Sequence, residues 1–236
     1  HIESSDQSGA LQGNIYAVID QSHLTLRQAL DDLNHWCDVL ILHQNVKACT
    51  TSNQQNQGAL RLYAGRKFAQ PLKDSFPIEF KTDNITSTGE YLEVSLSADE
   101  GPLNTHSYRI KFSAIPLGSQ TSFLHLSYAY QYGFAAKTAM KGYLATLGRN
   151  KIGFSVIDEK DNQPVYIKGI RGVIERNTMR YYLAIVAYLH SLSAPAEKQQ
   201  ATRLENWFDA TQQYPKQLHE LDRDDYIKMK RDELDR

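Results

Sequence analysis

The sequence predicts an α+β fold in which a curved antiparallel sheet wraps around a long C-terminal helix and leaves an internal cavity between them. Two observations predict it. Apolar and polar residues alternate over consecutive segments between about residues 42 and 132, and a helical period then runs through residues 170–192. A period of two, in segments separated by Gly, Asn, Asp or Pro, is typical of antiparallel strands with one buried face.

The N-terminal part precedes this sheet with an arm, a strand and two helices. Residues 1–12 are polar and rich in Ser and Gln, so we predict a flexible arm. Residues 14–20 have the composition of a strand. Apolar residues at 26, 29, 30 and 33 follow the i, i+3, i+4, i+7 pattern of a helix, and a second short helix is expected through 34–37.

The sheet is predicted from a run of alternating segments, and a polar turn over 53–58 separates the first two. These segments are 42–51, 60–65, 76–81, 92–97, 108–114 and 124–132.

Helices dominate the rest of the chain. We predict a helix over 134–147 closed by Gly148, an extended stretch over 151–157 and a turn over 158–162. The long helix over 170–192 ends before Pro195. The domain therefore spans 13–195, and residues 196–236 should form two or three short helices packed on its outside.

Composition excludes several functional classes. The 236 residues are 41% hydrophobic and 22% charged, with 14 Tyr and 8 Phe, which is typical of a compact globular protein. The net charge of −1 argues against nucleic acid as a partner, because phosphate binding needs a basic excess. Apolar runs are far shorter than the roughly 20 residues that cross a bilayer.

Two features bear on the compartment. The chain begins with His1, as it would after cleavage of a secretory signal or removal of a tag, so a periplasmic or secreted location and a cytoplasmic one both stay open. A disulfide between Cys37 and Cys49 would suit an oxidising compartment, but two cysteines are too few to establish one.

Four segments of the chain carry a family resemblance: Trp36–His43, Tyr91–Val94, Glu100–Leu103 and Gly172–Tyr182. Through them the chain resembles the START-like (SRPBCC) helix-grip superfamily, and most closely uncharacterised bacterial START-like lipid-binding proteins. The resemblance covers roughly residues 12–192; the linker 134–168 and the tail after 195 are additional. It implies a helix-grip fold with a hydrophobic cavity.

Tyrosines are the best candidates for ligand contact, because a tyrosine gives an apolar wall with a hydroxyl that needs a partner when buried. Arg180, or Arg176 beside it, would hold a carboxylate or phosphate through its bidentate fork. The alternatives are a solid aromatic core and a solvated helix face with an Arg171–Glu175 pair. The predicted ligand-binding residues are Phe112, Leu126, Tyr128, Tyr130, Asn177, Arg180, Tyr181 and Ile185.

These observations favour a protein that binds, and in one version transports, a lipid or other apolar small molecule. No nucleotide, serine-hydrolase or metalloprotease motif is present, and we expect no cofactor. His35, Cys37 and His43 lack a fourth metal ligand, so we expect no metal site either. The segment 134–148 is either a packed connector or a basic lid that touches a membrane surface transiently.

Two other functional classes remain open. An enzyme on the same fold, such as a cyclase, dehydratase or hydrolase of polyketide-like or small aromatic substrates, would use a Tyr hydroxyl, His125 or Glu175 as acid or base. An interaction protein would present the aromatic residues of the charged tail 196–236 to a partner.

Overall fold

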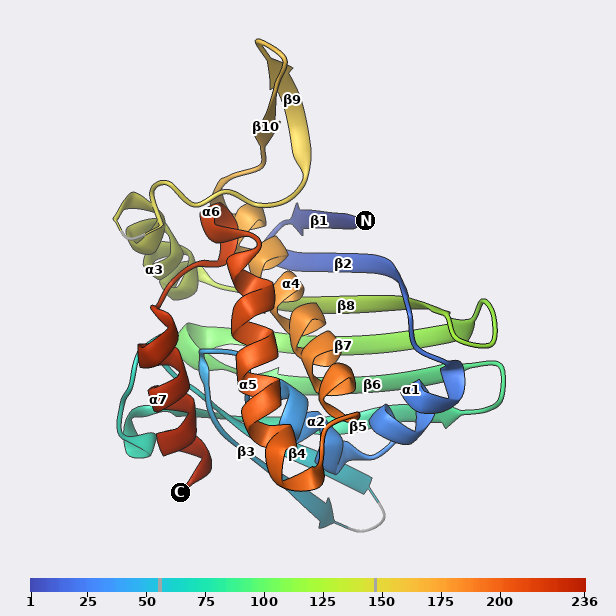
Figure 1. Cartoon of the computed structure of the whole chain (residues 1–236). Helices are drawn as coiled ribbons and strands as arrows, with labels where there is room; N and C mark the ends of the chain where they lie inside the picture. The colour runs from blue at the N-terminus through green and yellow to red at the C-terminus, as the bar shows by residue number, and fades with distance from the viewer. Residues whose placement is uncertain (55–56, 147) are drawn as a thin grey trace.

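The computed structural model describes residues 1–54, 57–146 and 148–236. Figure 1 shows one antiparallel sheet with the helices α4 and α5 lying across one of its faces. The elements are β1 (Ile2–Gln7), β2 (Ala10–Ile19), α1 (His23–Leu30), α2 (Leu33–Leu40), β3 (Val46–Gln54), β4 (Gln57–Ala64), η1 (Leu72–Asp74), β5 (Phe76–Ser87), β6 (Leu92–Glu100), η2 (Pro102–Asn104), β7 (Thr105–Pro116), β8 (Ser122–Tyr132), α3 (Phe134–Ala145), β9 (Val156–Lys160), β10 (Gln163–Tyr166), α4 (Gly169–Ser191), α5 (Ala196–Gln212), α6 (Pro215–Leu218) and α7 (Arg223–Leu234).

The predicted α+β class is confirmed. The sheet order is β1-β2-β8-β7-β6-β5-β4-β3, and neighbouring strands are antiparallel. The strands β3 to β8 form a meander, and β8 pairs with β2, which precedes the helix pair α1–α2. Alternation along each strand puts apolar side chains on the helix side, as with Leu92, Val94 and Leu96 of β6.

The long helix α4 packs closely on the sheet at Gly13. A Cβ at this position of β2 would collide with the side-chain oxygen of Thr178, so glycine is what lets the helix approach the strand. Beside α4 lies α5, whose Trp207 donates from Nε1 to the carbonyl oxygen of Arg180 at 3.1 Å. The tail is therefore held to α4 by buried side chains.

The prediction of a flexible arm at residues 1–12 is wrong. Residues Ile2–Gln7 form the edge strand β1, joined to β2 by a turn at Ser8 and Gly9, which both have positive φ. Backbone pairing needs no apolar alternation, so the polar sequence concealed this strand. Arg171 of α4 also holds β1 in place by donating to the carbonyl oxygen of Ser4 at 2.6 Å.

Glu175 has a structural role that differs from the predicted pair with Arg171. Its buried carboxylate accepts hydrogen bonds from the hydroxyls of Ser4 and Ser155 and from the backbone N–H groups of Phe154 and Ser155. Among the described residues, no ion pair joins it to Arg171. The carboxylate thus ties both β1 and the linker to α4.

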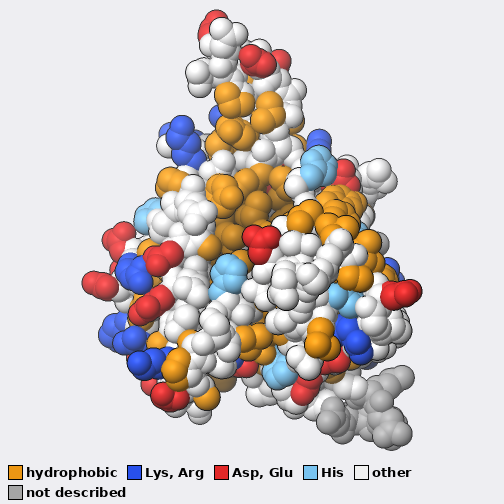
Figure 2. All heavy atoms as spheres, turned by 45° about the vertical axis from the view of Figure 1, so that its right-hand side comes forward, with side chains coloured by type: hydrophobic (Ala, Val, Ile, Leu, Met, Phe, Trp, Pro, Cys, Tyr) orange, Lys and Arg blue, Asp and Glu red, His pale blue; other side chains and the backbone are white. Residues whose placement is uncertain are grey.

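The linker contains a β-hairpin, β9–β10, that stands away from the sheet (Figure 1). Its strand begins at Val156 and its turn is confined to Asp161 and Asn162, so the predicted strand and turn lie too early. Figure 2 shows apolar side chains along this protrusion, where Val156 and Ile157 are exposed.

No helix of the described residues is long and apolar enough to cross a membrane. The tip of the predicted turn 53–58, at residues 55–56, lies outside the described residues.

A disulfide between Cys37 and Cys49 joins α2 to β3. The bridge closes a loop with a sequence separation of 12, and closing a loop of this size stabilises a protein by about 3 kcal/mol, mainly by restricting the unfolded chain.

Reduction should therefore lower the free energy of unfolding by about 3 kcal/mol. Urea denaturation with and without dithiothreitol measures this difference. The double variant Cys37→Ser/Cys49→Ser should match the reduced protein and show no further response to reductant. Equal stability of the oxidised and reduced forms would contradict the prediction.

Candidate functional site

A pocket of about 370 Å³ lies among the concave side of the sheet, α4 and α3. Its wall is mostly apolar and aromatic, with a few polar side chains, which is the usual make-up of a small-molecule site. The wall residues are His43, Asn45, Val46, Leu62, Ala64, Gly65, Ile78, Phe80, Pro102, Leu103, Thr105, Tyr108, Tyr128, Tyr130, Ala136, Ala139, Met140, Tyr143, Asn177 and Tyr181.

Contacts between tyrosine rings shape this wall. The ring of Tyr108 stacks on that of Tyr130 with 5.2 Å between centroids, and Tyr128 meets Tyr181 of α4 edge-on at 5.2 Å. Tyr128 and Tyr130 share a face of β8, and the paired strand β7 places Tyr108 beside them. Burial raises the pKa of Tyr128 and Tyr181, so both hydroxyls stay protonated and can donate a hydrogen bond.

The structure places four of the predicted ligand-binding residues on the pocket wall: Tyr128, Tyr130, Asn177 and Tyr181. Three others lie outside this wall, and they are Phe112, Leu126 and Ile185. For Phe112 the physical reason is Trp36 of α2, a fully buried side chain that packs edge-on against it at 6.0 Å. Leu126 and Ile185 are buried in the hydrophobic core.

His43 is a wall residue that the sequence singled out only as a metal ligand. Its Nδ1 accepts a hydrogen bond from the backbone N–H of Asn45 at 3.1 Å, so in the neutral ring Nε2 carries the proton. Burial, followed by the positive charges of Arg180 and Lys230, holds the pKa of His43 well below its usual value. The ring stacks on Tyr181 at 4.7 Å, and its buried Nε2 has no hydrogen-bond partner among the described residues.

The eighth predicted residue, Arg180, lines a smaller cavity of about 140 Å³ that shares Asn45, Tyr143 and Asn177 with the pocket. The alternative of a solvated arginine face is wrong, because Arg176 and Arg180 are only 2% and 1% exposed. Packing of the tail against this part of α4 buries them: Arg180 donates to the carbonyl oxygen of Leu218 at 3.3 Å and pairs with Glu220 at 3.1 Å.

Comparison with known proteins gives structural likenesses alone. No family model and no curated protein matches the sequence. Among solved structures, the ZhuI aromatase/cyclase from Streptomyces sp. R1128 has 9% identity and a TM-score of 0.41, covering 89% of this chain and 93% of its own. A START superfamily protein from Mycobacterium smegmatis has 14% identity and a TM-score of 0.39, covering 58% and 92% respectively. A hypothetical protein from Helicobacter pylori has 12% identity and a TM-score of 0.45, covering 74% and 85%.

The chain's own topology decides the fold. A first strand, a helix pair, a meander that closes back against that strand and a long helix across the sheet follow in order. The chain has a helix-grip fold. Functions on such a fold are set by the site, so the pocket rather than the architecture must carry any functional conclusion.

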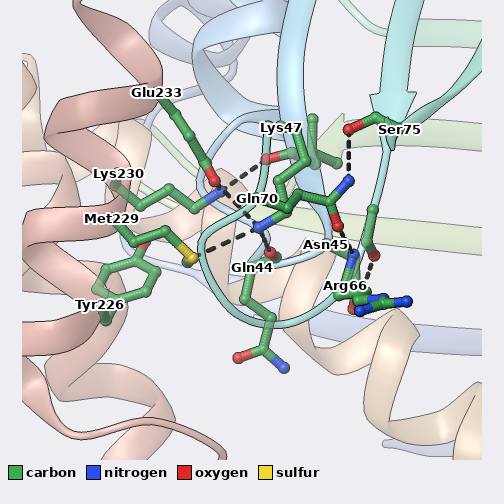
Figure 3. Close-up of polar contacts among 12 residues, drawn as sticks. Gln44, Asn45, Lys47, Arg66, Gln70, Ser75, Tyr226, Met229, Lys230 and Glu233 are labelled. Atoms are coloured by element: carbon green, nitrogen blue, oxygen red, sulfur yellow. Dashed lines mark hydrogen bonds and ion pairs between the residues drawn. The ribbon is translucent and has the colours of Figure 1, made fainter. Parts of the chain in front are cut away.

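One end of the helix-grip pocket is fastened to α7, whose Lys230 and Glu233 Figure 3 shows next to the segment that carries Gln44, Asn45 and Lys47. Lys230 donates to the carbonyl oxygens of His43 and Val46, at 2.9 and 2.7 Å, and so holds the segment that carries three wall residues. Glu233 lies between Lys230 and Lys47, at 2.8 and 3.0 Å, and all three side chains are buried. The tail is therefore part of the structure that supports the pocket.

Most of the residues named for the other two functional classes lie away from the pocket; the exception is the tyrosine hydroxyl named for the enzyme class, since Tyr128 and Tyr181 are on the pocket wall. His125 is on the outer face of β8, stacked on Tyr16 at 4.5 Å, and Glu175 is fully engaged in the hydrogen bonds described above. In the tail, Trp207 and Phe208 are buried against the core and cannot face a partner. Cys37 is engaged in the disulfide, which removes it from any metal-ligand set.

Proposed function

We propose that this protein binds a lipid or another apolar small molecule in the pocket between the sheet, α3 and α4. The observation that carries the proposal is the pocket of about 370 Å³ with its mostly apolar, aromatic wall. The buried Nε2 of His43 has no partner among the described residues, which is costly, and a ligand oxygen that reached it would satisfy it. The hydroxyls of Tyr128 and Tyr181 add further donors.

Helix α3 is the element we propose to move when the ligand enters. One face of this helix contributes Ala136, Ala139 and Met140 to the wall. The opposite face is exposed, with Phe134 at 86% exposure and Lys137 among its neighbours. An apolar side chain beside lysines suits brief contact with a membrane surface, from which an apolar ligand could be taken up or to which it could be delivered.

Native mass spectrometry of the purified protein, before and after incubation with sterols, long-chain alcohols, fatty acids and phospholipids, tests the proposal. Extra mass that is lost on denaturation is the expected result. A protein that carries no extra mass and gains none from this panel would contradict it.

Filling the pocket should abolish this binding. Ala136→Phe places a ring in the wall from α3, and we expect it to weaken binding of the tightest ligand in the panel by about tenfold or more. The control is Ala135→Phe, which adds the same ring on the exposed side of the same helix. Equal affinities of the two variants, measured by titration calorimetry, would show that the ligand binds elsewhere.

A further inference from the structure

The smaller cavity next to the pocket is unusually rich in positive charge. Three cationic side chains, Lys67, Arg176 and Arg180, contribute to its wall, together with Asn45, Tyr143, Val173 and Asn177. No carboxylate is among these wall residues. The nearest acid is Glu220, which pairs with Lys67 at 2.6 Å and with Arg180 at 3.1 Å.

The charges here do not balance. Lys151 also lies in this region and donates to the carbonyl oxygen of His219 next to Glu220. Four cations therefore gather near Glu220, and the only other carboxylate of the described residues that acts on one of them, Glu175 on Arg176, is already engaged in hydrogen bonds with Ser4, Phe154 and Ser155. Burial and then Arg180 lower the pKa of Lys67 to about 8, against the opposing effect of Glu220. Burial alone would raise the pKa of Glu220, but the nearby cations outweigh it, and the carboxyl stays ionised.

Arg176 has few partners for a buried guanidinium. Within the described residues its side chain donates from Nη1 to the carbonyl oxygen of Ile152 at 3.2 Å, lies beside the hydroxyl of Tyr143, and forms no ion pair with a carboxylate. In addition, the buried Nε of Arg180 has no partner in the described part of the chain. Burying cationic donors without acceptors is costly, and an anion in the cavity would offset that cost.

The cavity and the pocket are neighbours. Asn45, Tyr143 and Asn177 line both, so the polar end of a molecule in the aromatic pocket would lie next to the cavity that Arg176 and Lys67 line. A guanidinium beside an ammonium suits an acidic oxygen pair, because the arginine fork binds two oxygens at once.

We propose that the ligand is an amphiphile whose acidic head group, a carboxylate or phosphate, binds in the cationic cavity while its chain occupies the aromatic pocket. This inference rests on the proposed function, since it assigns a polar end to the same ligand. Such a site should bind acidic single-chain lipids more tightly than neutral ones of equal chain length.

The first test compares hexadecanoate, hexadecyl phosphate and hexadecanol by titration calorimetry at neutral pH, with acetate and inorganic phosphate as free anions. We expect one or both acidic amphiphiles to bind about tenfold or more tightly than the alcohol, and the free anions to bind far more weakly. Equal binding of the alcohol and both acids would overturn the inference and leave the proposed function intact. Free phosphate binding as tightly as hexadecyl phosphate would also overturn it. Failure of all three long chains to bind would overturn the inference as well, and the proposed function would then stand or fall on the sterols and phospholipids of the wider panel.

The second test removes the head-group contact. Arg176→Met should reduce affinity for the acidic amphiphile about tenfold or more and leave hexadecanol within about twofold, while Arg176→Lys retains part of the preference. Arg171→Met is the matched control, because this arginine lies on the same helix and contacts Ser4 outside the cavity. Lys67→Met replaces Arg176→Met if the latter does not fold. An unchanged preference for acid over alcohol in the folded variant would overturn the assignment.

Discussion

Replacing Glu233 with Gln should lower the free energy of unfolding by about 3–5 kcal/mol, because it leaves two buried ammonium groups without a counter-charge. Glu233 is the carboxylate that Lys47 and Lys230 share, at 3.0 and 2.8 Å, and both lysine side chains have no exposed surface (Figure 3). Their remaining partners are backbone carbonyl oxygens and the sulfur of Met229, which cannot balance two positive charges. Urea denaturation of the variant and the parent protein at pH 7.5 measures the loss.

The neighbouring acid provides the control. Asp232 pairs with Lys228 on the surface of α7, where both side chains are more than half exposed. Asp232→Asn removes the same charge from the same helix, and we expect a change within about 0.5 kcal/mol, as is usual for exposed pairs. Similar losses in the two variants would show that the buried cluster adds no stability beyond its net charge.

Stability should rise as the pH is raised from about 8 toward 10. Burial lowers the pKa of Lys230 and of Lys67 to about 8, so the folded protein releases these protons before the unfolded chain does. Between these pKa values the unfolded state binds more protons, and the free energy of unfolding then increases with pH by up to about 1.4 kcal/mol per unit for each group. Denaturant titrations at half-unit intervals should show a rise of about 2 kcal/mol or more over this range.

Above pH 10 the free energy of unfolding should fall again as the pH increases. Burial raises the pKa of Tyr128 and of Tyr181, so the folded state keeps phenolic protons that the unfolded chain gives up near pH 10. The sign is then opposite, and stability falls as the pH increases. In Lys230→Met the free energy of unfolding should rise less steeply with pH below pH 10 and should still fall above pH 10. An unchanged slope below pH 10 in this variant would show that Lys230 does not contribute to the rise.

Local patterns were enough to predict the sheet and the long helix. The alternation in β6 to β8 and the helical stripe of α4 record which side chains face the core, because each strand or helix must bury one face. The same patterns brought Tyr128, Tyr130 and Tyr181 together. They say nothing of β1, which joins the sheet through backbone hydrogen bonds that any polar sequence can make.

The position of the pocket along the sheet could not be predicted from such patterns. Phe112 and Tyr128 both face the helix side of the sheet, yet Trp36 packs against the first while the second borders open space. Which of the two residues lines a cavity depends on the helix that covers it. The sequence of the strand alone does not show which helix that will be.

The architecture could be predicted without a structure, because the period of apolar residues is a property of neighbouring positions. Folding in three dimensions is what brings Arg176, Arg180 and Lys67 together near Glu220, joins Cys37 to Cys49, and leaves the buried Nε2 of His43 without a partner among the described residues. These meetings join residues from distant segments. The energy of a buried charge or polar group depends on what surrounds it in space, which the order of residues along the chain does not show.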